Sequence, residues 1–131
     1  MMALVMKISQ YLLGVMFLVF GLNGFFGFFP TPPPAEQVAP FMKGLASAGY
    51  FFPFVKMVEV VTGAALLAGV FVPLALLILA PVVVNIVMLH LMLDPSGGAI
   101  GYFALILLVL TMFRYKPQFD GVLKMKADVK P

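Results

Sequence analysis

The side chains that could do chemistry in this chain are few, and they lie in or beside long apolar stretches. Lys56 and Glu59 stand three residues apart in the second such stretch, and His90 and Asp94 stand four apart at the end of the third. Residues at these spacings share one face of a helix, so each pair can form an ion pair or a hydrogen bond. Ionisable groups at membrane depth are costly and usually face a protein interior, so they mark a candidate functional site.

Two amides and a phenol accompany these charges. Asn23 lies near the end of the first apolar stretch, and Tyr102 begins the fourth. Asn85 and His90 point about 140° apart around a helix, so the third stretch presents two polar faces. We predict a ligand-binding site built from these six residues: Glu59, Lys56, His90, Asn85, Asn23 and Tyr102.

Metal binding and purely structural roles are the alternatives for the same residues. One histidine and one carboxylate are too few for zinc unless Glu59 joins them, and Lys56 beside Glu59 repels a cation, so we predict no metal site. Lys56 can also extend to the membrane surface. Glu59 can instead pair with Lys56 or accept a hydrogen bond from Asn23 or Tyr102. His90 can be a hydrogen-bonded packing residue.

The composition indicates an integral membrane protein. Of its 131 residues 63% are hydrophobic and 10% charged, whereas a soluble domain has about 25% charged residues. The chain has no cysteine and one histidine, which excludes disulfides, iron–sulfur clusters and bis-histidine haem within one chain. No phosphate-binding loop or hydrolase motif is present, so whether the chain is an enzyme stays open. The basic residues gather at one end of the chain, which argues against nucleic acid as a partner.

Four apolar stretches predict a single all-α domain, an up-and-down four-helix bundle that spans a membrane. Proline- and glycine-rich segments separate the stretches, and their short length makes successive helices antiparallel neighbours. The expected spans are residues 4–29, 53–70, 73–93 and 100–115, followed by a basic tail at 116–131.

A further short helix is expected in the first outer loop, at residues 34–49. Pro34 suits its first position and Gly49 its C-terminal cap. Phe41, Leu45 and Ala48 fall at helical spacing. Because the segment is too short to span, we predict that it lies across the mouth of the bundle with this face turned inward.

Four glycines leave positions without a side chain on the surface of the first span: Gly14, Gly21, Gly24 and Gly27. Gly14 and Gly21 are seven residues apart and therefore lie nearly on one face of a helix, where they would let a neighbouring helix approach closely. We predict a packing role for all four glycines.

The polar candidates all fall in the outer half of the predicted bundle. The inner half is almost purely aliphatic apart from Tyr11, Arg114 and Tyr115. A solute transporter needs a polar path across the membrane, so this asymmetry argues against transport.

Three segments match the pattern of a known family: GLNGFF at 21–26, GYFFPFVKMVEVVTGAALLAGVFVPLALLILAP at 49–81 and VNIVMLHLMLDPSG at 84–97. Through them the chain resembles the DoxX family of small bacterial four-span membrane proteins, over nearly all of residues 8–115. The resemblance implies a four-helix bundle in the bacterial cytoplasmic membrane. Some relatives are subunits of archaeal thiosulfate:quinone oxidoreductases, and distant ones act as cargo receptors or assembly factors.

The function expected from this resemblance is a subunit associated with quinone-linked oxidoreduction. Glu59 and His90 would handle protons, and Asn23, Asn85 and Tyr102 would hold a carbonyl-bearing head group such as that of a quinone. The expected partners are membrane lipids and either an oxidoreductase subunit or a second copy of the chain. The alternative is a non-catalytic lipid-binding or assembly protein, in which the same groups grip a lipid or a partner helix.

The basic residues predict the orientation in the membrane. Five of the eight basic residues follow Phe113, and Lys7 opens the first span, so the positive-inside rule places both termini in the cytoplasm. A fluorescent protein fused after Pro131 should therefore fluoresce, and alkaline phosphatase fused there should be inactive. An active phosphatase fusion would contradict this orientation. The residues assigned to the outer half of the membrane would then lie in its cytoplasmic half, and the reverse.

Overall fold

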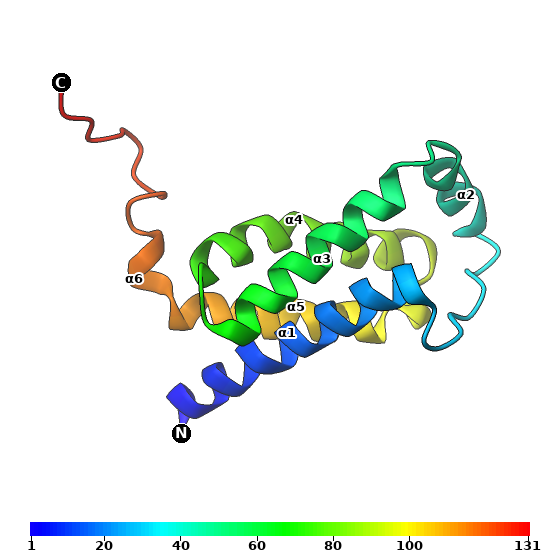
Figure 1. The fold of residues 1–131 in the computed structure, drawn as a ribbon, viewed down its shortest axis with the longest axis horizontal. Helices are drawn as coiled ribbons and strands as arrows, with labels where there is room; N and C mark the ends of the chain where they lie inside the picture. Colours follow the sequence, from blue (N-terminus) through cyan, green and yellow to red (C-terminus); the bar gives the residue numbers. More distant parts are fainter.

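A computed structural model describes residues 1–131 as an all-helical chain, which confirms that the fold is all-α (Figure 1). It contains no strand. The elements in order are α1 (Met2–Phe26), α2 (Ala39–Ser47), α3 (Phe51–Ala68), α4 (Val72–Leu93), the 3₁₀ turn η1 (Pro95–Gly97), α5 (Ala99–Arg114) and α6 (Lys116–Phe119).

Three of the helices, α1, α3 and α4, are long and apolar enough to cross a membrane, which indicates a membrane protein. The stretch expected to form a fourth span folds as α5, an apolar helix of 16 residues. At 1.5 Å per residue it is about 24 Å long, less than the ~30 Å hydrocarbon thickness of a bilayer. Helix α5 is apolar like the other three helices and is the shortest of the four, two residues shorter than α3.

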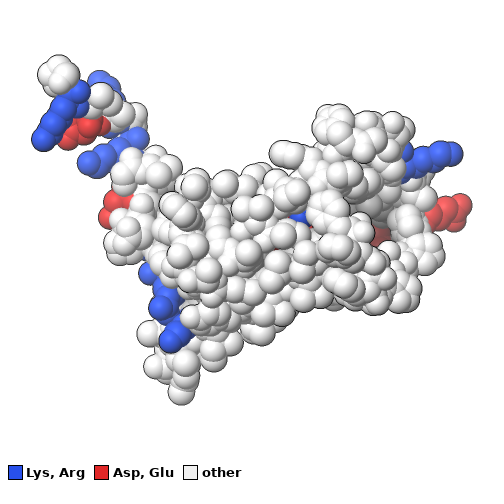
Figure 2. Space-filling view, in the orientation of Figure 1, with Lys and Arg blue, Asp and Glu red and all other residues white.

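These four helices pack side by side around a common core. Helix α1 lies against α3 and α5, and α4 lies against the same two helices from the other side. We call the end of the body that carries residues 27–50 and 94–98 the loop end, and the end that carries both termini the tail end (Figure 1). Charged side chains on the visible face gather at these two ends and leave the body between them almost free of charge (Figure 2).

Glycines bring the backbones of α1 and α3 into direct contact. A Cβ atom added at Gly63 would lie 2.6 Å from the Leu18 nitrogen and 2.9 Å from the Gly14 carbonyl oxygen. A Cβ at Gly14 would lie 2.9 Å from Leu67 Cγ, and one at Gly21 would lie 2.9 Å from the backbone nitrogen of Val60. The predicted close approach at Gly14 and Gly21 is confirmed, and α3 is the neighbouring helix.

Gly27 has a different role from the packing role predicted for it. It adopts the left-handed conformation (φ 61°) and donates its N–H to the Asn23 carbonyl, and nothing lies within 4 Å of where its Cβ would be. Since this conformation is strained for residues with a Cβ atom, glycine ends the helix here. Helix α1 therefore ends at Phe26 and not at residue 29.

Helix α2 exists, but its start and its orientation differ from the prediction. It begins at Ala39 with Pro40 in its first turn, so Pro40 takes the position predicted for Pro34. No residue of α2 is buried, and Phe41 is 42% exposed. The predicted inward apolar face is formed only in part: Leu45 is half-buried, but Phe41 and Ala48 are exposed, because α2 touches the body only lightly, through α3 at the loop end (Figure 1).

The α1–α3 contact predicts a large penalty for a methyl group at Gly63. In Gly63→Ala the new Cβ meets backbone atoms, which cannot rotate away, so we expect a loss of about 1–3 kcal/mol in the free energy of unfolding. Gly44→Ala in α2 is the matched control, because nothing lies within 4 Å of its Cβ position and alanine is the better helix former by about 1 kcal/mol. Thermal unfolding in detergent measures both; equal melting temperatures would contradict the packing.

Candidate functional site

An ion pair lies near the loop end of α3; its carboxylate is buried, whereas the Lys56 side chain is 29% exposed. Lys56 Nζ is 2.9 Å from Glu59 Oε2, and Glu59 is only 4% exposed. Helix α1 makes room for both side chains with glycines: a Cβ at Gly24 would lie 2.6 Å from Cγ and Cδ of Lys56, and one at Gly21 would lie 3.1 Å from Glu59 Cβ. The pair expected from the sequence spacing is therefore formed, and it is pressed against the glycine face of α1.

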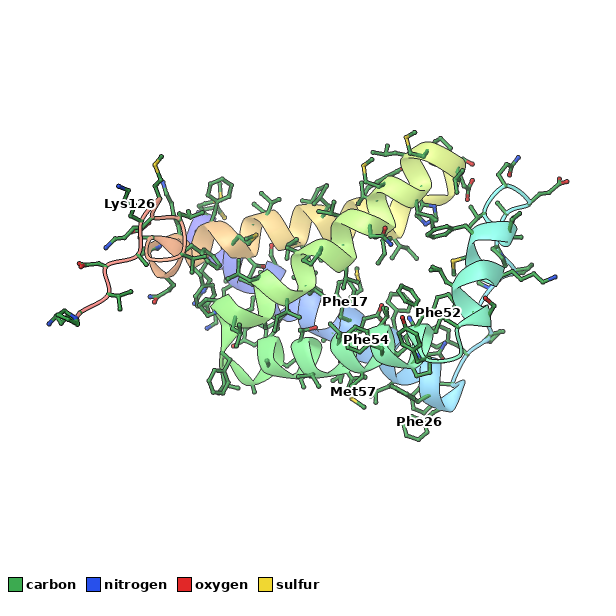
Figure 3. The ribbon with its side chains drawn as sticks, turned by 90° about the horizontal axis from the view of Figure 1, so that it is seen from above. Phe17, Phe26, Phe52, Phe54, Met57 and Lys126 are labelled. Atoms are coloured by element: carbon green, nitrogen blue, oxygen red, sulfur yellow. The ribbon has the colours of Figure 1, made fainter.

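This ion pair borders a cavity of about 440 Å³, which we call the loop-end cavity. A cavity of this volume is within the range of pockets that hold small organic ligands, roughly 300–1,000 Å³. Phe17 lies in the interior between the helices, whereas Phe26 and Met57 point away from them (Figure 3). The cavity is lined by residues of α1, α3, α4, α5 and the segment after α1: Met16, Phe17, Phe20, Asn23, Gly24, Thr31, Lys56, Glu59, Ile86, Ile100, Gly101 and Ala104.

Asn23 lines the same cavity and also stabilises the chain reversal after α1. Its Oδ1 accepts a hydrogen bond from the Phe29 backbone N–H at 2.9 Å, and the residue is 8% exposed. The amide oxygen thus has a structural partner, while the amide nitrogen makes no hydrogen bond within the protein. Of the six predicted site residues, Lys56, Glu59 and Asn23 are brought together.

His90 and Tyr102 lie elsewhere, in the last turn of α4 and the first turn of α5, on either side of the connecting turn. His90 Nδ1 is 3.3 Å from the Asp94 carbonyl oxygen and 3.8 Å from Asp94 Oδ2. The Tyr102 hydroxyl donates to the Pro95 carbonyl at 3.0 Å. Neither residue lines the loop-end cavity. Both fix the geometry of the turn, so the structure does not join His90 to Glu59 as a proton-handling pair.

Asn85 also lies outside the cavity. It is exposed on α4 and its side chain makes no hydrogen bond, whereas its neighbour Ile86 lines the cavity. Neither of the two polar faces predicted for this helix, at Asn85 and at His90, lines the loop-end cavity. No three histidine or carboxylate side chains lie together where they could hold a metal ion.

Several lining residues were not singled out from the sequence. Thr31 enters from the proline-rich segment, and Gly101 and Ala104 provide a small-residue wall on α5. Their signal was weak, because small residues three apart on an apolar helix are common at helix packing contacts. Only the contact with the other helices turns them into the wall of a cavity.

A second polar cluster lies near the tail end, where the sequence predicted an aliphatic interior. Gln10 is 3% exposed; its Nε2 donates to the Leu66 carbonyl at 2.8 Å, and its Oε1 accepts from the Tyr115 hydroxyl at 2.9 Å. Leu66 lies in the last turn of α3, where carbonyls lack partners within the helix. Gln10 therefore links α1 to the end of α3 and to Tyr115 after α5. Both the nitrogen and the oxygen of its side-chain amide have a hydrogen-bond partner within the protein.

Comparison with known proteins gives no match: no protein-family model, no curated protein and no solved structure is similar to this chain. The chemistry of the site therefore comes from its own geometry. It consists of an ion pair with a buried carboxylate and one amide, which line a cavity whose other walls are mainly apolar.

The Gln10 cluster predicts that the Tyr115 hydroxyl stabilises the fold. Tyr115→Phe leaves Gln10 Oε1 without its donor in a buried position, and we expect a loss of about 1–3 kcal/mol in the free energy of unfolding. Tyr11→Phe is the matched control, since Tyr11 is exposed on α1 and its hydroxyl makes no hydrogen bond within the protein. Chemical unfolding in mixed micelles measures both variants. An unchanged stability of Tyr115→Phe would show that the hydrogen bond contributes nothing.

Proposed function

We propose that this chain is a four-helix, up-and-down membrane bundle of the DoxX type, whose loop-end cavity binds the polar head of a lipid-soluble ligand. The observation that carries the proposal is the Lys56–Glu59 pair, 2.9 Å apart and with its carboxylate buried, beside a cavity of about 440 Å³. Removing a carboxylate from water is costly even when a lysine pairs with it, and packed apolar residues often stabilise a fold equally well. Ionisable groups inside a membrane protein therefore point to a ligand or a proton.

The membrane placement is supported by the helices and by the charges. Three helices are long enough to span, and α5 completes the set of four that pack together. The tail end carries Lys7, Arg114 and the lysines of residues 116–130. Under the positive-inside rule this end faces the cytoplasm of a bacterial cell and the loop-end cavity faces the outer half of its cytoplasmic membrane.

Within this proposal the cavity serves quinone-linked oxidoreduction. Asn23 Nδ2 and the remaining N–H groups of Lys56 are positioned at the cavity to donate hydrogen bonds to an oxygen of the head group, and Glu59 exchanges a proton with it. The chain contains no cysteine, so thiol chemistry does not supply the electrons. An oxidoreductase subunit or a second copy of the chain bound in the membrane is the proposed partner.

A non-catalytic lipid-binding or assembly protein is the second candidate, and one observation favours it. His90 and Tyr102 are engaged with Asp94 and Pro95 in the α4–α5 turn, so they form no proton relay from Glu59. A site that only binds the head group of a lipid needs no proton relay.

Single and double variants of the ion pair test the proposal. In Glu59→Gln the amide oxygen can still accept from Lys56, so we expect the melting temperature to stay within a few degrees while the co-purified ligand is lost. The double variant Lys56→Met with Glu59→Gln should also fold, because replacing a whole buried pair by neutral packing is often tolerated. Glu36→Gln, at an exposed position in the loop, is the control and should keep the ligand.

The measurement is paired: thermal stability, and extraction of the lipids that accompany the purified full-length protein. A quinone or its quinol in the wild-type extract that is absent from Glu59→Gln supports the oxidoreduction role, and phospholipid alone supports the second candidate. A single variant that loses stability, with rescue in the double variant and no change in ligand, would show that the pair is only a structural tie.

A further inference from the structure

One oxygen of the buried Glu59 carboxylate has no partner within the protein. Oε2 accepts a hydrogen bond from Lys56 Nζ at 2.9 Å, and no other hydrogen bond reaches the side chain. Every side-chain nitrogen or oxygen that is completely sealed from its surroundings does have a partner. The other oxygen, Oε1, therefore opens onto space, and the space that Glu59 lines is the loop-end cavity. A carboxylate held in an ion pair only accepts hydrogen bonds, so what Oε1 lacks is a donor.

Asn23 has a free hydrogen-bond donor, whereas Glu59 has a free acceptor. The Phe29 N–H donates to one atom of its amide group, which identifies that atom as the oxygen and orients the amide. The NH₂ group, which makes no hydrogen bond within the protein, is left for the cavity. The cavity thus offers one strong acceptor, Glu59 Oε1. It also offers donors, which are Asn23 Nδ2 and the remaining N–H groups of Lys56.

The charges at the cavity favour a neutral head group. Lys56 and Glu59 compensate each other, and no other charged side chain lines the cavity. A phosphate would lie against the carboxylate and an ammonium group against the lysine. A third charge without a partner of its own is costly beside walls that are mainly apolar. The apolar walls, which include Met16, Phe17 and Phe20, suit a chain or a ring behind the head.

From these contacts we infer that the loop-end cavity selects a neutral amphiphile whose head group carries a hydroxyl, over head groups that only accept hydrogen bonds and over charged ones. A hydroxyl can donate to Glu59 Oε1 and accept from Asn23 Nδ2 at the same time, which an ether or a ketone cannot. The inference rests on the proposed function and narrows its ligand class. A quinol and a neutral lipid with a free hydroxyl share this chemistry; an oxidised quinone and a phospholipid lack it.

Matched probe pairs separate the hydroxyl from the rest of the ligand. The first pair is 1-hexadecanol and its methyl ether, the second is 2-dodecylhydroquinone and its dimethyl ether, and hexadecyl phosphate tests a charged head. Equilibrium binding of each radiolabelled probe is measured on the full-length protein in phosphatidylcholine nanodiscs. We expect the hydroxyl member of at least one pair to bind about 10-fold or more tightly than its ether, since a hydrogen bond to a charged group is involved. The pair that binds more tightly distinguishes a neutral lipid from a quinol.

Two variants connect the discrimination to Glu59. Glu59→Gln places an amide where the carboxylate stood, and the preference for hydroxyl over ether should fall to within about 3-fold because an amide can also donate. Glu36→Gln, the same substitution at an exposed position, should keep the full preference.

The outcomes separate this inference from the proposed function. Ether and hydroxyl probes that bind wild-type protein equally well would overturn the hydroxyl preference and leave a ligand cavity in place. Hexadecyl phosphate as the tightest probe would overturn it in favour of an anionic lipid. Probes that all fail to bind above the level of empty nanodiscs would overturn both the inference and the ligand cavity itself. A hydroxyl preference that persists in Glu59→Gln would show that another group is responsible.

Discussion

The close approach of α1 and α3 is the constraint on which the rest of the structure depends. In a membrane, lipid tails are as apolar as leucine side chains, so helices associate through van der Waals packing and not through the hydrophobic effect. Gly63 against the Gly14 carbonyl and the Leu18 backbone supplies that packing. The same glycine face continues to the loop end, where Gly21 and Gly24 leave space for Glu59 and Lys56. One sequence feature thus packs two helices and also shapes the site.

Helix period and composition predicted much of this fold. Apolar runs located the four long helices, the seven-residue spacing predicted the glycine contact, and the three-residue spacing predicted the Lys56–Glu59 pair. Helix ends were less predictable, because rival signals were equally good locally. Pro34 and Pro40 both suit the first turn of a helix, and only Pro40 has that position. Gly27 ends α1 through its backbone conformation, which an apolar pattern does not report.

The candidate site was only half predictable for a geometric reason. Periodicity gives the angle between two residues on one helix but not the rotation of that helix against its neighbours. On α4 this rotation turns Ile86 to the cavity and leaves Asn85 exposed. The role of Gln10 could not be predicted, because its partners, Leu66 and Tyr115, are 56 and 105 residues away in the chain. A single amide in an apolar run also has no spacing pattern that would indicate a partner.

The two polar clusters of this protein differ in how many of their hydrogen-bonding atoms have partners within the chain. Near the tail end, Gln10 bonds on both sides of its amide, and the Ser9 and Thr111 hydroxyls bond to carbonyls of their own helices. Such groups are satisfied by the fold and need nothing more. At the loop end, Glu59 and Asn23 each use one polar atom within the protein and leave the other at a cavity. Both unpartnered atoms are accessible and not sealed inside the protein, so only the loop-end cluster leaves hydrogen-bonding capacity that a molecule from outside the chain can use.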